Sequence, residues 1–122
     1  MNLMSEVFFR TMLKFLPWTS NEYNNSIERK GKLLETVVIE DIFMPEIIKL
    51  LKENKEKKLL GEIFNFFEEV SEYGDQHLVN IFSITVLEIL GNENVVLEVA
   101  KMYMGPKTTE LQIEADRGLG RL

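Results

Sequence analysis

The sequence predicts an all-α protein, either a compact bundle or a set of stacked helical hairpins with five to seven helices. Two observations predict this class. Apolar side chains recur at three- and four-residue spacing through most of the 122 residues, as on one face of an amphipathic helix. Short stretches with Gly, Pro or Asn separate these segments, and short connections make consecutive helices antiparallel neighbours. The length suits one domain, which we expect to span residues 1–122.

The first helix is predicted over residues 3–16, with Ser5 near its start as the cap and Pro17 as its end. An amphipathic helix of this kind also suits a membrane surface, but its polar face carries little positive charge. We therefore expect it to lie on the core. Its apolar face consists of Met4, Phe8, Met12 and Phe15.

Residues 17–31 are predicted to form a loop because turn-forming residues crowd this stretch. Two aromatic residues, Trp18 and Tyr23, lie within it. Each is interpreted either as an anchor packed on the core or as a contact at a binding surface. The turn-forming residues are Pro17, Ser20, Asn21, Asn24, Asn25, Ser26 and Gly31.

Residues 32–43 fit two structures. The β-branched run 37–39 favours a strand, whereas the apolar spacing also fits a helix. We predict a helix, because the chain offers no second strand to pair with it. A separate helix is predicted over residues 45–54, since Pro45 suits a first turn. The mixed lysines and glutamates from Lys49 to Lys58 are interpreted as a solvated helix face and not as a basic patch.

The clearest helix is predicted over residues 56–73, with a broad apolar stripe opposite an acidic face. Gly74 is expected to end it, and Asp75 to cap the next helix. Residues 76–90 are apolar almost all round, which is typical of the buried centre of a small domain.

Two more helices complete the prediction. Asn92 is expected to cap a helix over residues 93–104. Thr109 and Gln112 have the spacing of a capping box, which predicts a last helix over about 110–117. Two glycines, Gly118 and Gly120, predict a loose chain end.

The charge balance bears on the partner. The 14 Lys and Arg against 20 Asp and Glu give a net charge of −6, which disfavours binding to nucleic acid or to an anionic membrane and favours a basic protein partner. Solubility alone is the competing explanation for mild acidity. The chain has no cysteine, no basic segment followed by an apolar run as in a signal peptide, and no apolar run near 20 residues. We therefore expect a cytoplasmic protein.

The residues offer little for catalysis. The lone histidine, His77, is expected on the surface of a first turn, and HExxH, GxSxG and phosphate-loop patterns do not occur. We expect no catalytic residues, no cofactor, no metal and no enzymatic activity. Carboxylates are the exception, because Glu40-Asp41 lies between apolar residues, where a buried capping or ion-pairing role competes with catalysis. The acidic residues of 62–75 are expected to stay solvated.

Residues 61–111 carry a resemblance to a family. The Phe64–Val70 helix before Gly74-Asp75, the Ile81–Leu90 run with its Leu-Gly turn, and the Tyr-Met-Gly-Pro-Lys-Thr turn resemble uncharacterised small helical bacterial proteins. Some of these are encoded beside polymorphic toxin genes as immunity proteins. The resemblance implies an acidic, rigid protein that blocks a toxin by forming a tight heterodimer. Many such toxins are basic nucleases.

The leading hypothesis is a protein-binding module, most concretely an immunity protein that occludes the active or substrate site of a basic toxin domain. A generic helical scaffold or adaptor, including a homodimer, is the alternative, and an enzyme based on carboxylates is the third reading. Aromatic anchors would stabilise such a complex, with Tyr23 a further candidate. The residues expected at the binding surface are Glu62, Glu68, Glu69, Glu72, Asp75, Tyr73, Glu40, Asp41 and Trp18.

Overall fold

The computed structural model describes residues 3–30 and 34–122, which form seven continuous helices and no strand. The predicted all-α class and helix number are confirmed. The elements, in chain order and with continuous helices joined by hyphens, are α1 (Ser5–Phe15), η1 (Pro17–Thr19)-α2 (Ser20–Lys30), α3 (Glu35–Val38)-η2 (Ile39–Phe43)-α4 (Met44–Glu53), α5 (Lys57–Tyr73), α6 (Gln76–Phe82)-η3 (Ser83–Leu87)-α7 (Glu88–Leu90), α8 (Asn94–Lys101) and α9 (Pro106–Gly118).

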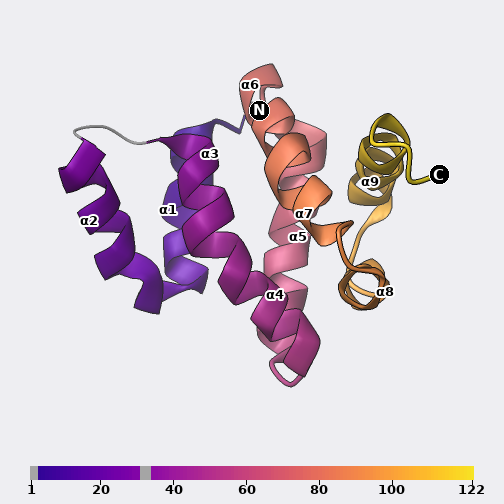
Figure 1. The fold of residues 1–122 in the computed structure, drawn as a ribbon, viewed down its shortest axis with the longest axis horizontal. Coiled ribbons are helices and arrows are strands. Elements are labelled where there is room, and N and C mark those ends of the chain that lie inside the picture. The colour runs from indigo at the N-terminus through magenta and orange to yellow at the C-terminus, as the bar shows by residue number, and fades with distance from the viewer. Residues whose placement is uncertain (1–2, 31–33) are drawn as a thin grey trace.

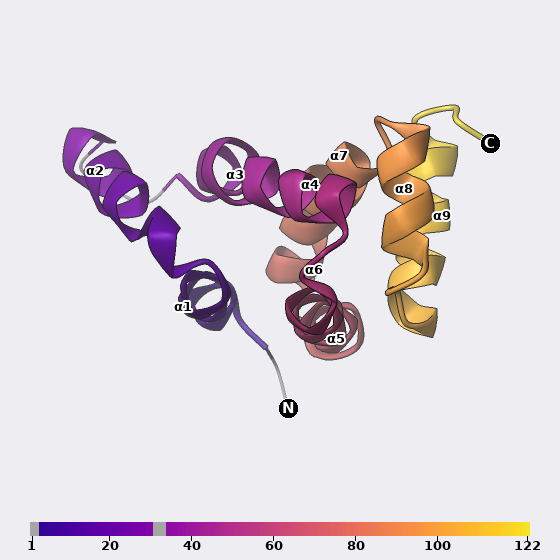
Figure 2. The ribbon, with the colours of Figure 1, turned by 90° about the horizontal axis from the view of Figure 1, so that it is seen from below.

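The helices form two layers with a helix or a helix pair at each end. The α1 and α5 helices lie side by side in one layer, and the α3–α4 and α6–α7 helices form the other (Figures 1 and 2). The α2 helix lies at one end of the molecule, and α8 and α9 lie together at the other. The first five helices alternate in direction, as their short connections predict.

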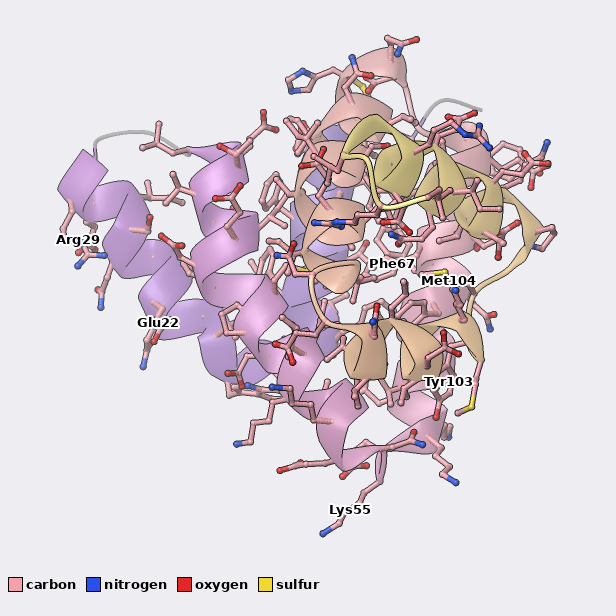
Figure 3. All side chains as sticks on the ribbon, turned by 45° about the vertical axis from the view of Figure 1, so that its right-hand side comes forward. Glu22, Arg29, Lys55, Phe67, Tyr103 and Met104 are labelled. Carbon is pink, nitrogen blue, oxygen red and sulfur yellow. The ribbon has the colours of Figure 1, made fainter. Side chains whose placement is uncertain are left out.

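The core is built largely from phenylalanine. Seven of the eight phenylalanines are buried, and Phe15 packs against the same cluster. Phe67 lies at the centre of the molecule (Figure 3), with its ring centroid 5.0 Å from that of Phe64 and 5.2 Å from that of Phe82. Phe8 stacks on Phe66 at 5.9 Å. These contacts join α1, α5 and α6 through one apolar interior.

Residues 35–53 form one helix, whereas the sequence predicts two with a break before Pro45. The η2 segment is π-helical, and the Met44 N–H bonds to the Ile39 carbonyl five residues back. Proline has no N–H for the carbonyl four residues earlier, and its ring crowds that carbonyl. The wider turn directly before Pro45 accommodates this defect within a continuous helix. A second π-helical segment, η3, packs against η2 in the interior.

The prediction of a loop over residues 17–31 is wrong for the described part, which is helical from Pro17 to Lys30. Gly31 lies outside the described residues. The packing of Tyr23 accounts for the helical structure of this segment. Its ring centroid lies 6.3 Å from that of Phe43 in a stacked arrangement and 6.4 Å from that of Phe9. Each asparagine lowers the stability of a helix by only about a few tenths of a kcal/mol. The burial of an aromatic ring contributes more stability than this. Two roles are predicted for Tyr23, and the structure shows it as an anchor packed on the core.

Of the two predicted caps at Ser5 and Asp75, the first is replaced by other contacts and the second is confirmed. The α1 helix begins after Met4 with no side-chain cap, so Ser5 is its first helical residue. Leu3 instead pairs with the turn before α6, donating to the Tyr73 carbonyl at 2.7 Å and accepting from Asp75 N–H at 2.8 Å. The predicted cap at Asp75 is confirmed, because its carboxylate accepts from Leu78 N–H at 2.8 Å.

The chain end is held in place, contrary to the prediction of a loose tail. The Arg121 guanidinium donates to the Glu88 carbonyl at 3.0 Å and lies 3.3 Å from the buried carboxylate of Asp116. Arg121 also donates to Asn92, which therefore does not cap α8 as predicted. Gln112 donates to the Leu87 carbonyl at 2.9 Å. Side chains from the last helix and the tail thus satisfy carbonyl groups at the end of α7.

Tyr23 provides a test of how α2 is held. Tyr23→Ala removes the ring between Phe9 and Phe43 and is expected to lower the free energy of unfolding by about 2 kcal/mol, less than for a fully buried aromatic residue. Tyr23→Phe keeps the ring and is expected to change it by less than about 0.5 kcal/mol. Urea unfolding followed by circular dichroism measures both variants. An equal loss in the two would show that the hydroxyl, not the ring, secures α2.

Candidate functional site

Three connected hollows form a groove along the face where α2 approaches the α3–α4 helix. We call it the Trp18 groove. The first hollow, of about 580 Å³, is lined by Glu22, Asn25 and Arg29 from α2 and by Val37 and Asp41 from the facing helix. Figure 3 shows Arg29 toward the C-terminal end of α2 and Glu22 nearer its start.

The second hollow joins the first to the third. It measures about 180 Å³ and shares Glu22 and Asp41 with the first hollow. It shares Trp18 and Glu46 with the third hollow, of about 420 Å³, which continues along α4 to Glu56 before α5. Trp18 therefore lies at the junction of the second and third hollows.

Trp18 is exposed but fixed. The η1 turn carries it, and 54% of its surface remains accessible. Its indole N–H donates to the Glu46 carboxylate on α4. The adjacent Thr19 is buried, and its hydroxyl donates to the Leu16 carbonyl at 2.6 Å, which fixes the turn. A large aromatic side chain is thus presented to solvent in a defined position.

The groove is acidic. Among the described residues, no ion pair involves any of its five carboxylates. Two basic side chains, Arg29 and Lys49, lie in the first and third hollows respectively, and neither lines the second. The five carboxylates belong to Glu22, Asp41, Glu46, Glu53 and Glu56. A hollow acidic surface of this kind attracts cationic groups.

The predicted binding residues occupy three different places. Trp18 and Asp41 line the groove, and Glu40 is exposed beside Asp41 on η2. Both carboxylates of this pair are exposed, so the predicted buried role for them is wrong. Asp75 is the cap of α6. The remaining exposed members lie on α5 and line none of the three hollows: Glu62, Glu69, Glu72 and Tyr73.

Glu68 has a structural role instead of the solvated one predicted for it. Its Oε1 accepts from the backbone N–H and the hydroxyl of Thr108, both at 2.9 Å, and its Oε2 accepts from Lys107 N–H at 2.9 Å. These N–H groups lie in the first turn of α9, where a carboxylate satisfies unpaired donors and the positive helix end. Glu68 of α5 therefore caps α9 from another helix.

This contact also explains the start of α9. The helix begins at Pro106, earlier than the predicted start near residue 110, and Thr109 donates back to the Gly105 carbonyl without forming a capping box. A Cβ at Gly105 would lie 2.5 Å from the Glu68 side chain, so glycine is what allows the close approach. Although partial burial raises the pKa of Glu68, the hydrogen bonds from Thr108 and Lys107 and the charge of Lys107 hold it below its usual value.

Sequence reasoning missed Glu22, Arg29 and Glu46. Glu22 and Arg29 are spaced at seven residues, with Asn25 and Ser26 between them, which is one helical face. That periodicity predicts a shared surface only if residues 17–31 are treated as a helix. Glu46 follows Ile42 by four residues on the α3–α4 helix, but the expected break at Pro45 placed the two on separate elements.

His77, expected on the surface, is exposed at the start of α6 and lies 2.8 Å from Glu35 Oε1. Within residues 3–30 and 34–122, no three His, Asp or Glu side chains are placed so that they would hold a metal ion. None of the described helices has both the length and the apolar character needed to cross a bilayer.

Comparison with known proteins identifies the family. A family model described as "Domain of unknown function (DUF7674)" matches residues 9–120. This match spans most of the chain, so the chain belongs to the DUF7674 family. No curated protein and no solved structure matches the chain. The family match extends well beyond residues 61–111, on which the predicted resemblance rests, and the family description assigns no function.

Glu68 gives a prediction about stability and pH. Glu68→Ala is expected to lower the free energy of unfolding by about 1–2 kcal/mol at neutral pH, as for other helix caps. Because folding lowers the pKa of Glu68, its contribution is complete above the ordinary value of about 4.5 and is lost as the pH falls through the lowered value.

Urea unfolding at pH 7 and at a series of lower pH values measures this contribution. The difference between the wild-type chain and Glu68→Ala is expected to shrink with acidification. Glu69→Ala, one residue away and exposed, is the matched control and is expected to change stability by less than about 0.5 kcal/mol. A difference that stays constant as the pH falls would exclude the ionised cap.

Proposed function

We propose that this member of the DUF7674 family is a non-catalytic protein-binding module that neutralises a cognate bacterial toxin by occluding the toxin's active or substrate site. The observation that carries the proposal is the Trp18 groove, in which a fixed, half-exposed tryptophan is surrounded by carboxylates without ion-pair partners among the described residues. The resemblance to immunity-associated proteins makes the toxin the most concrete partner.

The groove has the features of a binding surface for a basic protein. Tryptophan is enriched among residues that dominate binding energy, because it contributes a large contact area. The bond to Glu46 holds the indole before binding, so little side-chain entropy is lost on association. Carboxylates around it accelerate encounter with a positively charged partner, and the rate then depends on ionic strength.

The acidic face of α5 is a second surface for such a partner. Glu62, Glu69 and Glu72 are exposed there, with Tyr73 at its end 47% accessible. Lysines 57 and 58 precede this stripe at the start of the same helix. We favour the groove because it combines acidic charge with a concave shape and a fixed aromatic anchor.

The alternative function, a homodimeric scaffold, is supported by a different feature. Val95 and Met102 of the α8 segment are 72% and 67% exposed, and their spacing of seven residues places them on one side of it. Two such surfaces related by a twofold axis would pair with each other. Analytical ultracentrifugation distinguishes this function, because it predicts a dimer that Met102→Glu disrupts.

A direct test of the proposed function uses the neighbouring gene, if it encodes a large protein with a variable C-terminal domain. Co-expression of this chain with that domain in bacteria is expected to restore growth, and the two are expected to co-purify. An unrelated acidic helical protein of similar size is the control. Failure of this chain to protect cells from that domain would contradict the toxin-neutralising function.

Matched charge variants locate the binding surface. The groove variant Glu22→Gln/Asp41→Asn/Glu53→Gln and the α5 variant Glu62→Gln/Glu69→Gln/Glu72→Gln each remove three exposed carboxylates, so both change the net charge from −6 to −3. The groove variant is expected to slow association with the toxin domain by about tenfold, because local charge steers encounter. The α5 variant is expected to change the rate by less than about threefold.

Surface plasmon resonance at low and at physiological salt measures these rates. The difference between the two variants is expected to narrow as ionic strength rises, because screening weakens exposed charges. A larger effect of the α5 variant would move the proposed interface to α5. If the association rate of the wild-type chain does not depend on salt, steering of the partner by exposed carboxylates is contradicted.

A further inference from the structure

We infer that the second hollow of the Trp18 groove receives an arginine side chain of the partner, with its guanidinium stacked on Trp18 and paired with the surrounding carboxylates. The inference rests on the proposed function, because it names the chemical group that the binding surface recognises. It assigns a specific role to the middle of the groove, where the hollows lined by α2 and by α4 meet.

The charge distribution points to this hollow. Glu22, Asp41 and Glu46 line it, and no basic side chain does. Arg29 and Lys49 lie only in the hollows on either side. A single positive group placed in the middle therefore meets three carboxylates, none of which has an ion-pair partner among the described residues. The two outer hollows are each partly neutralised by a cation of the chain itself.

The geometry of Trp18 favours a planar cation. An indole N–H donates in the plane of the ring, so the bond to Glu46 fixes the ring without covering its faces. Trp18, with 54% of the residue's surface accessible, lines the acidic hollow. Cations are attracted to the face of tryptophan more strongly than to other aromatic rings.

Arginine suits this combination better than lysine. Its guanidinium stacks flat on an aromatic ring while its donors, which lie in the same plane, reach carboxylates at the edge. The lysine ammonium is a compact and strongly hydrated charge that does not stack. The hollow of about 180 Å³ corresponds to roughly six water molecules, which suits one long side chain and is too small for a helix.

The fluorescence of the chain's own tryptophan can be used to test this inference. Trp18 is the only tryptophan, so intrinsic tryptophan fluorescence reports directly on the groove. Titration with a blocked nona-arginine peptide is expected to change this fluorescence at low salt. A blocked nona-lysine peptide of equal charge is expected to bind about tenfold more weakly, because it lacks the stacking contact.

Two variants separate stacking from charge, with isothermal titration calorimetry as the readout because one of them lacks the tryptophan. Trp18→Leu keeps an apolar side chain but removes the ring, and is expected to reduce the preference for arginine over lysine to less than about threefold. Glu46→Gln keeps an acceptor for the indole N–H and removes a charge. It is expected to weaken both peptides by a similar factor and to leave the preference unchanged.

The triple α5 variant, Glu62→Gln/Glu69→Gln/Glu72→Gln, is the matched control and is expected to retain the arginine preference. Circular dichroism verifies that each variant is folded. Equal affinity for the two peptides, no binding of either, or an unchanged preference in Trp18→Leu would overturn the inference. Protection of cells from the toxin domain by the wild-type chain is measured separately, so the proposed function can stand when the arginine inference fails.

Discussion

The need to cover the α6–α7 helix on nearly every side organises the rest of the fold. Its buried residues point in all directions around the axis, and only a narrow strip from Gln76 to Ile84 is exposed. Contacts from α1, α5, η2, α8 and α9 enclose it. Each of these covering helices has one apolar face for the core and leaves its polar residues outside. The polar surface of the protein is a consequence of this division, and the excess of Asp and Glu over Lys and Arg makes it acidic.

Two groups of carboxylates can be distinguished in the chain, those that stabilise the fold and those that line the groove. Some hold the fold together: Glu68 caps α9, Asp75 caps α6, and the buried Asp116 binds Arg121. Removing a buried partner of this kind leaves unpaired polar groups and is costly. Among the described residues, the carboxylates of the Trp18 groove make no such structural contact apart from that of Glu46, which orients Trp18. These like charges line one continuous surface and repel one another in the free protein.

The groove depends on the core through α2. One wall of the first hollow is α2, and the ring of Tyr23 connects this helix to the buried Phe43 of the facing helix. The same η2 segment supplies Asp41 to the groove and Phe43 to the interior, because residues two apart lie on opposite sides of a helix. The lining of the groove and the packing of the core are thus linked within a few residues of one helix.

The sequence by itself determined the helical class, the apolar faces of the helices, and the cap at Asp75, because these depend on spacing along the chain. It also determined the acidic charge, and it singled out Trp18 and Asp41. Only the tertiary structure decided that residues 17–30 are helical, since the ring contacts of Tyr23 with Phe9 and Phe43 join distant segments. The tertiary structure also places the Glu68 carboxylate at the start of α9, where it caps a residue 40 positions later in the chain. It places Glu22 and Glu46, from different helices, in the lining of the same hollow. The spacing of apolar residues can be read directly from the sequence. Contacts between side chains on different helices depend on how those helices pack, which spacing along the chain does not give.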